Sequence, residues 1–469
     1  MGTFITLLVI PLGSLLTRCT SAELGVPLSI GEPFGLCHAG YSQSAEEYEI
    51  LAALGNQWMR VDFPWSSIEP ENDTWSFTTW DYYVGNASLN HQKILAILDY
   101  DVSWLNASGD YTSRPYIKPR DIPVFLDYVN HTVRRYRENV TAFEIWNEPN
   151  GRGFWDGPES DFFQLFNATA ELIHSIDPNI IIVGGVVAGN DPAYIERMFQ
   201  AGIMRRVDVI SFHPYSANVN EIYPKIAAVK AVGAKYGFHG EYWITEVGNP
   251  TGGTYGHRVS LEDLPERVIK TLVYATISNI TCIIWYCMFD WGDALKASKP
   301  NDSEGYFGLI YPDNRTWKTG AYAFQQFSKG VSNSQYRPDL LRRQTIVSQN
   351  IVRAFLYRRA DGNTTIIAWT DSNLINGNEN LEVTLNLPSN ASLVLYHNIS
   401  TGEITPVPSW TFQVCYYPIF LTFMAGNPGD EVILIIHDSW FMSVFVIGMP
   451  IVIIALISLV IWQQRTKMR

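Results

Sequence analysis

The sequence predicts a (β/α)8 TIM barrel, followed by a small antiparallel β-sandwich and one C-terminal transmembrane helix. Three observations predict this order: strand-like apolar runs alternate with helical segments over roughly the first 330 residues, short alternating strands follow, and a long uncharged apolar stretch comes last. The predicted boundaries are 1–22 for a signal peptide, 23–335 for the barrel, 336–438 for the sandwich, 440–462 for the transmembrane helix and 463–469 for a cytoplasmic tail.

Eight apolar runs in the barrel region have the length of β-strands. Strands of a parallel barrel are buried on both faces and therefore read as continuous apolar runs. The runs are Phe34–Cys37, Trp58–Asp62, Ile94–Asp99, Ala142–Trp146, Ile180–Gly184, Val207–Phe212, Tyr242–Thr245 and Thr281–Tyr286. The helical patterns between them are Ala45–Leu54, Val124–Arg137, Asp161–Ile176, Ala193–Ala201, Ile222–Lys235 and Leu261–Ser278. This alternation is typical of a (β/α)8 barrel.

Beyond about residue 335 the strands become short and alternating, and Asp-Gly, Asn-Gly and Pro-rich turns separate them. They are Ile351–Tyr357, Thr364–Thr370, Leu381–Leu387, Ser392–His397, Ile419–Phe423 and Glu431–Ile436. The pattern is typical of a β-sandwich. No catalytic residue types cluster in this region, so we expect the function to lie in the barrel.

Both ends of the sequence carry membrane signals. Residues 3–16 form a short apolar run, and the following Thr20-Ser21-Ala22 suits cleavage after Ala22. No Lys or Arg precedes the run, which leaves an uncleaved anchor as the alternative. The stretch 440–462 has no charged residue and is long enough to span a bilayer, and three basic residues follow it within 463–469. The positive-inside rule then predicts a single-pass cell-membrane protein whose body is extracellular or lumenal.

Twelve Asn-x-Ser/Thr sequons predict N-linked glycans on an exported body. They begin at Asn72, Asn86, Asn106, Asn130, Asn139, Asn167, Asn279, Asn301, Asn314, Asn363, Asn390 and Asn398. Cys19 would leave with the signal peptide, and the other four cysteines match no zinc-ligand spacing. One disulfide or buried free thiols are both open at this point. The net charge of −13 argues against a nucleic-acid partner and fits a neutral one.

Two glutamates end strand-like runs and form the strongest functional signal. Glu148 follows Phe143-Glu144-Ile145-Trp146-Asn147, and Glu246 follows Tyr242-Trp243-Ile244-Thr245. They are 98 residues apart, which matches three βα units of roughly 31 residues each. The strand ends of a barrel collect at one rim. Retaining glycoside hydrolysis needs two carboxyl groups about 5–5.5 Å apart, and this pair is placed to provide them.

With these motifs, the sequence resembles the clan of retaining glycosidases built on a (β/α)8 barrel with catalytic glutamates on strands four and seven. Within the clan it is most similar to the β-xylosidase-like and cellulase-like families. The stretches that carry the resemblance are Leu54–Asp62, Trp146–Asn150, Asp208–Tyr215, Trp243–Glu246, and Gly308–Ile310 with Lys318. They span roughly residues 30–330. They are specific for the clan and not for a particular sugar.

The resemblance implies roles for individual residues. Glu148 would be the general acid/base, with a pKa raised by an apolar pocket and by the second carboxylate. Glu246 would be the nucleophile that forms a covalent glycosyl-enzyme. Asn147 would bond the sugar 2-hydroxyl, and Arg60 would keep Glu246 ionised and oriented.

The remaining candidates would surround this pair. The resemblance implies that His213 and Tyr215 bond near the nucleophile and that Trp285 forms the floor under the sugar. His38, Asp62, Trp104 and Asp290 are further candidates for the pocket wall. No metal ion or cofactor is expected.

The sequence therefore predicts an extracellular, membrane-anchored retaining β-glycosidase that hydrolyses O-glycosidic bonds of a neutral glycan or glycoside by double displacement. The expected partner is a carbohydrate substrate. One alternative is a catalytically inactive sugar-binding or cell-surface adhesion protein on the same barrel, and another is a structural glycoprotein of a surface coat. Exo and endo action both remain open.

Overall fold

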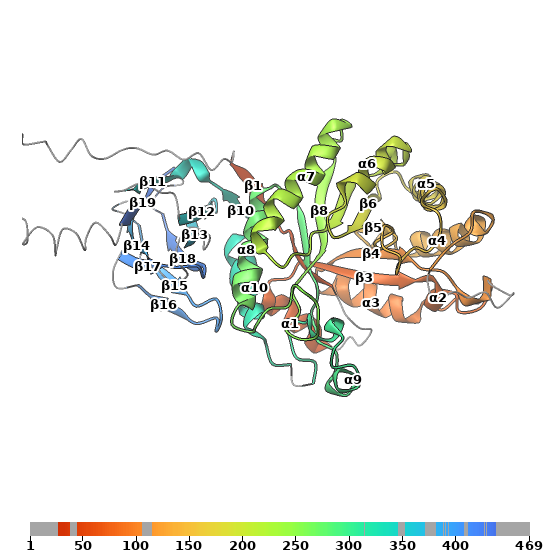
Figure 1. Cartoon of the computed structure of the whole chain (residues 1–469), viewed down its shortest axis with the longest axis horizontal. Helices are drawn as coiled ribbons and strands as arrows, with labels where there is room; N and C mark the ends of the chain where they lie inside the picture. The colour runs from red at the N-terminus through yellow and green to blue at the C-terminus, as the bar shows by residue number, and fades with distance from the viewer. Residues whose placement is uncertain are drawn as a thin grey trace, which may run out of the picture. The chain divides into compact units, whose positions relative to one another are not determined.

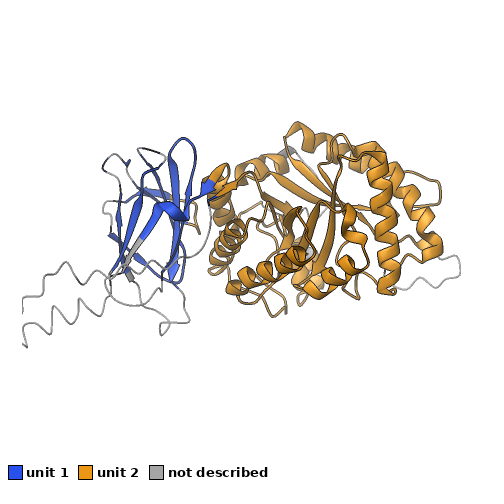
Figure 2. Cartoon of the chain, turned by 90° about the horizontal axis from the view of Figure 1, so that it is seen from above, with its two compact units in different colours: residues 1–27, 335–398, 404–469 blue, residues 28–334, 399–403 orange. Residues whose placement is uncertain are grey.

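The chain forms two compact units (Figure 2). The first in this description is made of residues 28–334 and 399–403, which are orange and marked unit 2 in the figure. The second is made of residues 1–27, 335–398 and 404–469, marked unit 1 in the figure. The structure is a computed structural model. It describes residues 27–37, 45–105, 115–313, 315–345, 352–370, 381–387, 389, 391–392, 394–407, 411–425, 427 and 429–437.

The first unit contains a closed parallel barrel of eight strands (Figure 1). A short strand β1 (Leu28–Ile30) precedes it. The barrel strands are β2 (Phe34–Cys37), β3 (Trp58–Pro64), β4 (Lys93–Asp99), β5 (Ala142–Ile145), β6 (Ile181–Ala188), β7 (Val209–His213), β8 (Glu241–Val247) and β9 (Cys282–Trp285). Closure is made by β9 alongside β2, with Phe34 opposite Ile283. The eight predicted strands are confirmed, with ends that move by a few residues.

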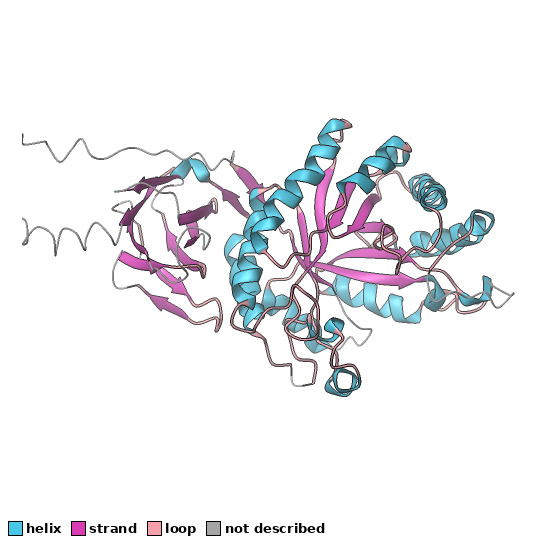
Figure 3. Cartoon of the chain, in the orientation of Figure 1, coloured by secondary structure: helices cyan, strands magenta, loops and turns pink. Residues whose placement is uncertain are grey.

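Helices surround the barrel, as the cyan ribbons around the magenta strands show in Figure 3. They are α1 (Ala45–Leu54), α2 (Trp65–Ile68), α3 (Thr78–Leu89), α4 (Ile122–Tyr136), α5 (Glu159–Ile176), α6 (Pro192–Gln200), α7 (Ile222–Lys235), α8 (Leu264–Ile277), α9 (Asp293–Ser298) and α10 (Thr319–Val331). The six predicted helices are present. The short helices α2 and α9 and the longer helices α3 and α10 were not predicted. Helix α3 contains poor helix formers such as Thr, Tyr and Gly, but it buries Trp80, Tyr83, Val84 and Ala87 at helical spacing.

The barrel interior is a packed core at one end and polar at the other. The rings of Trp58 on β3 and Trp243 on β8 meet edge to face, 5.0 Å apart, within an apolar cluster. Because side chains alternate along a strand, Arg60 and Asp62 share the inward face of β3 with Trp58. Strand β3 thus leads from an apolar layer to polar groups toward its C-terminal end, where barrel enzymes place their sites.

The second unit holds two sheets. Its strands are β10 (Ser334–Tyr336), β11 (Leu341–Thr345), β12 (Val352–Arg358), β13 (Asn363–Thr370), β14 (Leu381–Asn386), β15 (Leu395–His397), β16 (Ile404–Pro406), β17 (Thr411–Val414), β18 (Ile419–Met424) and β19 (Val432–His437). One sheet has the order β10-β12-β13-β18-β15-β16 and the other β11-β19-β14-β17. Alternate residues of both sheets, such as Leu356 and Leu385, form one apolar core. The sandwich prediction fits, except that β11 and β19 run parallel.

Among the described residues, no helix is long and apolar enough to cross a bilayer. The predicted signal peptide 1–22, transmembrane helix 440–462 and tail 463–469 lie outside the described residues, and they stay predictions. Cys37, Cys282, Cys287 and Cys415 are free thiols, and the first three are buried. Of the two alternatives, free thiols are therefore what the structure contains.

We expect Gly35→Ala to destabilise the barrel where β2 and β9 close it. An added Cβ would lie 2.5 Å from Ile284 Cδ1 and 2.7 Å from the carbonyl oxygen of Trp58, so the neighbouring strands must shift. Overpacking of this kind lowers the free energy of unfolding by about 1–3 kcal/mol. Thermal unfolding followed by tryptophan fluorescence measures it. The control is Gly153→Ala, where nothing lies within 4 Å; equal midpoints for both variants would contradict the prediction.

Candidate active site

Glu148 stands on a strained turn after β5. Trp146 and Glu148 have φ values of 69° and 48°, in the left-handed region that residues with side chains rarely adopt. The indole of Trp146 donates to the Phe154 carbonyl (2.8 Å), and the Glu148 amide donates to the Val186 carbonyl (3.0 Å). Val186 is presented by a register shift in β6, next to Gly185 at φ 91°. Several elements therefore hold the carboxyl-bearing residue in its strained conformation, as is common at functional sites.

Glu246 is brought to the same place by an irregularity in β8. The register with β9 shifts between Ile244 and Val247, and such bulges re-aim side chains. Glu246 Oε2 accepts a hydrogen bond from Arg60 Nη1 and Oε1 accepts one from the Tyr215 hydroxyl, both at 2.7 Å. Burial and the charge of Glu246 raise the pKa of Tyr215 well above its usual value, so the phenol remains a donor.

Arg60 is a buried cation shared by several acceptors. Its Nε donates to Glu144 Oε1 (2.9 Å), Nη2 donates to Asn147 Oδ1 (2.8 Å), and Nη1 donates to Glu246. Burial opposes its charge, but the carboxylates of Glu144 and Glu246 raise the pKa of Arg60 well above its usual value. Asn147 Nδ2 donates in turn to the Tyr100 hydroxyl (3.1 Å). The guanidinium thus ties β3 to β5, β8 and the turn that bears Glu148.

Glu148 has a different electrostatic environment from Glu246. Its side chain is only 12% exposed, and burial raises its pKa to about 7, with Arg60 acting in the opposite direction. His213 Nδ1 lies 2.7 Å from Glu148 Oε1, and Nε2 lies 3.1 Å from Thr245 Oγ1. Burial lowers the pKa of His213 to about 4, so this imidazole is neutral near pH 7. Glu148 can therefore exchange a proton near neutrality, while Glu246 is bonded to a permanent cation.

The two carboxyl groups face each other at short range. One oxygen of Glu148, one of Glu246 and a ring nitrogen of His213 all lie within 4.8 Å of one another. Among the described residues this is the one trio with metal-ligand spacing, but Arg60, Tyr215 and the His213–Glu148 contact already engage these groups. The spacing is close to the ~5–5.5 Å of a nucleophile and acid/base pair in retaining glycoside hydrolysis.

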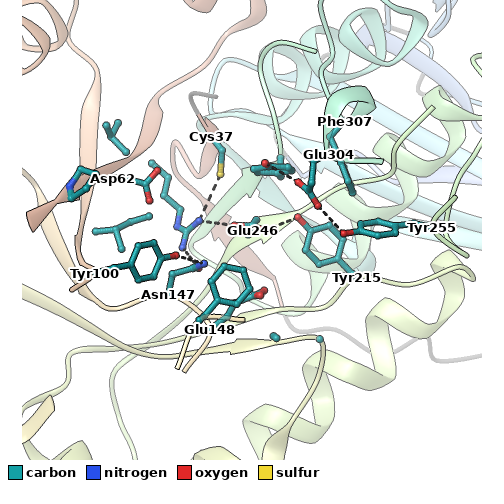
Figure 4. Close-up of a pocket in the computed structure, with 18 of the residues that line it drawn as sticks. Cys37, Asp62, Tyr100, Asn147, Glu148, Tyr215, Glu246, Tyr255, Glu304 and Phe307 are labelled. Carbon is teal, nitrogen blue, oxygen red and sulfur yellow. Dashed lines mark hydrogen bonds and ion pairs between the residues drawn. The ribbon is translucent and has the colours of Figure 1, made fainter. Parts of the chain in front are cut away.

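Both glutamates line a cavity of about 850 Å³ (Figure 4). Other side chains on its wall come from the strand ends and the loops that follow them: Cys37, Arg60, Asp62, Tyr100, Asn147, Phe154, Tyr215, Tyr255, His257, Tyr286, Glu304 and Phe307. The volume and the mixture of aromatic and polar groups fit a small organic ligand such as a sugar.

Most predicted site residues come together. His213 contacts Glu148, and a nitrogen of its ring also lies within 4.8 Å of a Glu246 oxygen. Three predicted residues do not line the cavity. Trp285 is fully buried, and the next residue, Tyr286, lines the cavity in its place. Asp290 is buried against Lys318 Nζ at 2.7 Å. The indole of Trp104 donates to the Glu69 carbonyl (3.0 Å) away from the cavity wall. His38 lies outside the described residues.

The expected cause of the raised Glu148 pKa also changes. The sequence analysis expected both burial and the second carboxylate to raise it. In the structure burial raises it, and the nearby guanidinium of Arg60 lowers it. The guanidinium of Arg60, which is bonded to Glu246, compensates the negative charge of Glu246 that would otherwise act on Glu148.

Several residues of the site were not predicted. Glu144 is fully buried on β5 and accepts from Arg60; a carboxylate inside an apolar strand run was the signal that could have found it. Tyr100 follows β4 directly, which is the position rule that found Glu148. Tyr255 and Glu304 lie on long connections after β8 and β9, where no alternation of apolar and polar residues indicates which side chains point into the cavity.

The family comparison agrees with this geometry. Residues 122–236, from α4 to the end of α7, match the family model described as Glycosyl hydrolases family 39. Over 127 residues it is 34% identical to a β-xylosidase of Geobacillus stearothermophilus, a match that covers 24% of this chain and 25% of the relative. The chain thus matches about a quarter of the length of that curated relative. The resemblance to a barrel glycoside hydrolase is confirmed.

Solved structures share the fold of this chain. A family 39 glycoside hydrolase from Bacteroides cellulosilyticus WH2 superposes with a TM-score of 0.67 at 17% identity, covering 84% of this chain and 81% of the other. A monomeric β-xylosidase from Caulobacter crescentus CB15 gives 0.62 at 14% identity, and a glucosidase from Croceicoccus marinus gives 0.60 at 14%. Both matches cover 86% of this chain and 98% of the relative.

We expect the Glu148 carboxyl to titrate near pH 7, because burial raises its pKa to about 7. Carbon-13 NMR of protein labelled at glutamate carboxyl carbons measures it, with Glu148→Gln identifying the signal. The protonated form should predominate below the midpoint and disappear above it. A Glu148 signal that shows no titration between pH 5.5 and 8.5 would contradict the assignment.

Proposed function

We propose that this chain is a retaining β-glycosidase that hydrolyses O-glycosidic bonds of a neutral glycan or glycoside. The observation that carries the proposal is the Glu148–Glu246 pair: two carboxyl oxygens within 4.8 Å, one on a group with pKa about 7 and the other bonded to Arg60. The spacing favours retention over inversion, because inverting enzymes hold the pair about 6.5–9.5 Å apart to admit water.

In the first step a Glu246 oxygen attacks the anomeric carbon. The bond to the leaving oxygen breaks, and Glu148 gives that oxygen its proton, which leaves a covalent glycosyl ester on Glu246. Arg60 and Tyr215 each donate to one Glu246 oxygen and fix the attacking group. His213 contacts Glu148 Oε1 and fixes the proton donor. Asn147, held by Arg60, places its amide beside the sugar 2-hydroxyl.

In the second step Glu148, now a carboxylate, accepts a proton from water. The water oxygen attacks the anomeric carbon, the ester bond to Glu246 breaks, and both glutamates return to their starting state. A pKa of about 7 suits this double role, because the group must both give and take a proton at one working pH.

The alternative is an inactive sugar-binding or adhesion protein on the same barrel. Loss of either glutamate, of Asn147 or of Arg60 would favour it, but all four are present and connected by hydrogen bonds or shared partners. We therefore rank it second.

We expect the wild-type chain to hydrolyse at least one member of a panel of aryl β-glycosides: glucoside, galactoside, mannoside, xyloside and cellobioside. Glu246→Ala should lower kcat by roughly 10⁴-fold or more, the scale of losing a nucleophile. Azide should rescue it and give the α-glycosyl azide. The matched control is Glu241→Ala, on the same strand but exposed. No turnover on aryl glycosides or polysaccharides would give the binding-protein alternative the lead.

We also propose that the protein is exported, N-glycosylated and held in the cell membrane by residues 440–462, with the barrel outside. The predicted segments at both ends support this (residues 1–22 and 440–462). The nine sequon asparagines within the described residues support it too, because each is partly or fully exposed: Asn72, Asn86, Asn130, Asn139, Asn167, Asn279, Asn301, Asn363 and Asn398. Attachment of a bulky glycan requires such exposure.

Expression in a eukaryotic secretory host tests the location. We expect the full chain in the membrane fraction, with a gel mobility that increases after enzymatic removal of N-linked glycans. A chain ending at Asp438 should be released into the medium. A full-length chain that is not glycosylated and does not sediment with membranes would refute this part of the proposal.

A further inference from the structure

The cavity wall carries a carboxylate, that of Glu304, which the two-step reaction does not use. Glu304 belongs to a short 3-10 turn, Ser303–Tyr306, and its side chain lines the cavity. Its Oε1 accepts a hydrogen bond from the Tyr255 hydroxyl and its Oε2 accepts one from the Tyr286 hydroxyl, both at 3.1 Å (Figure 4). Burial raises the pKa of Glu304, and the charge of Glu246 adds to the rise. The electrostatic effect of Glu246 therefore reaches this group.

The turn that bears Glu304 is fixed before any ligand arrives. Thr254 Oγ1 donates to the Asn301 carbonyl (3.1 Å), and the Tyr255 amide donates to Ser303 Oγ (2.9 Å). Lys318 Nζ, fully buried, donates to the Tyr306 carbonyl (3.2 Å) and to Asp290 (2.7 Å). This explains the burial of Asp290: the Asp290–Lys318 pair anchors the segment. Glu304 is therefore a preorganised acceptor.

The charge on the cavity wall is mostly negative. Asp62, Glu148, Glu246 and Glu304 all line it. Among the described wall residues the one permanent cation is Arg60, whose donors are already taken by Glu144, Asn147 and Glu246. Burial lowers the pKa of His257, so this ring is neutral near pH 7. A sugar with a carboxylate or sulfate would bring a second negative charge beside Glu304 without a described free cation to balance it.

Hydroxyl groups suit Glu304 better. Each carboxylate oxygen has two lone pairs, and the tyrosines occupy one on each oxygen. One acceptor site per oxygen remains, and two neighbouring hydroxyls of a pyranose ring can each donate to one of them. Charge-assisted hydrogen bonds of this kind are stronger than neutral ones.

We propose that Glu304 determines the substrate class: it accepts hydrogen bonds from a pair of neighbouring hydroxyls on a neutral sugar and excludes sugars that carry a carboxylate or sulfate. This rests on the proposed glycosidase function. Tyr255 and Tyr286 are positioning residues that hold the carboxylate through their hydroxyls.

The test compares wild type and E304Q, as full chains, on the preferred neutral aryl β-glycoside, its monodeoxy analogues and the aryl β-glucuronide. We expect kcat/KM on the neutral substrate to fall 10- to 100-fold in E304Q. The glucuronide-to-neutral ratio of kcat/KM should rise at least tenfold. Removal of one of the two bound hydroxyls should cost wild type much more than E304Q. A purely structural role would lower all substrates together and leave the ratio unchanged, and that result would overturn the proposal.

Controls separate the charge from the fold and from the catalytic function. E262Q changes an exposed carboxylate just before α8 and should leave every ratio unchanged. Y255F and Y286F keep the Glu304 charge, so turnover should fall without a gain on glucuronide.

If wild type hydrolyses nothing, a binding experiment still tests this inference. Saturation-transfer NMR measures binding of the free neutral sugar and of its uronic acid. Selective binding of the neutral sugar that E304Q abolishes would support this inference while the glycosidase proposal fails. Equal or absent binding would overturn it.

Discussion

The buried guanidinium of Arg60 is the interaction on which the rest of the site depends. It joins β3 to Glu144 on β5, to Asn147 on the following turn and to Glu246 on β8. A buried ion pair is a poor device for stability alone, since a well-packed apolar substitute is often as stable. Losing one partner, however, leaves an unpaired buried charge and costs about 3–5 kcal/mol. Arg60 therefore fixes positions: the network holds together only when its partners are in place.

The same cation separates the two glutamates electrostatically. Glu246 is bonded to the permanent cation Arg60, which compensates its negative charge directly. Glu148, within 4.8 Å of it, then responds mainly to burial, which brings its pKa to about 7. Two identical side chains in one cavity thus have different surroundings, and different surroundings are the general way enzymes assign acid and nucleophile roles. The neutral His213 lets Glu148 titrate without a competing imidazolium.

The parts of this arrangement that follow strand periodicity could be predicted from the sequence. Buried parallel strands read as apolar runs, and polar residues directly after them meet at one rim; Glu148 and Glu246 were found in this way. Arg60, inside a strand, was found through the family resemblance. Trp285 was misassigned because the direction of a side chain at a strand end depends on how the backbone leaves the strand. At the end of β9 the side chain that points into the cavity is shifted by one residue, so Tyr286 lines the cavity and Trp285 does not. Helix α3 was missed because burial of one face outweighed its poor propensity.

The position of Glu304 could not be predicted from strand periodicity. Nothing local to Ser303–Tyr306 places its carboxylate; contacts with Tyr255, Tyr286 and the Lys318–Asp290 pair do. Strand ends supply the reacting groups, while these long connections supply the outer wall, the usual division in barrel enzymes. The two are coupled by charge. Because the N–H groups of Arg60 already bond Glu144, Asn147 and Glu246, Arg60 is not free to bind an anionic sugar. The carboxylates around it make the cavity negative. In the proposed glycosidase, the ion pairing that orients Glu246 is therefore also the reason that the cavity favours uncharged sugars.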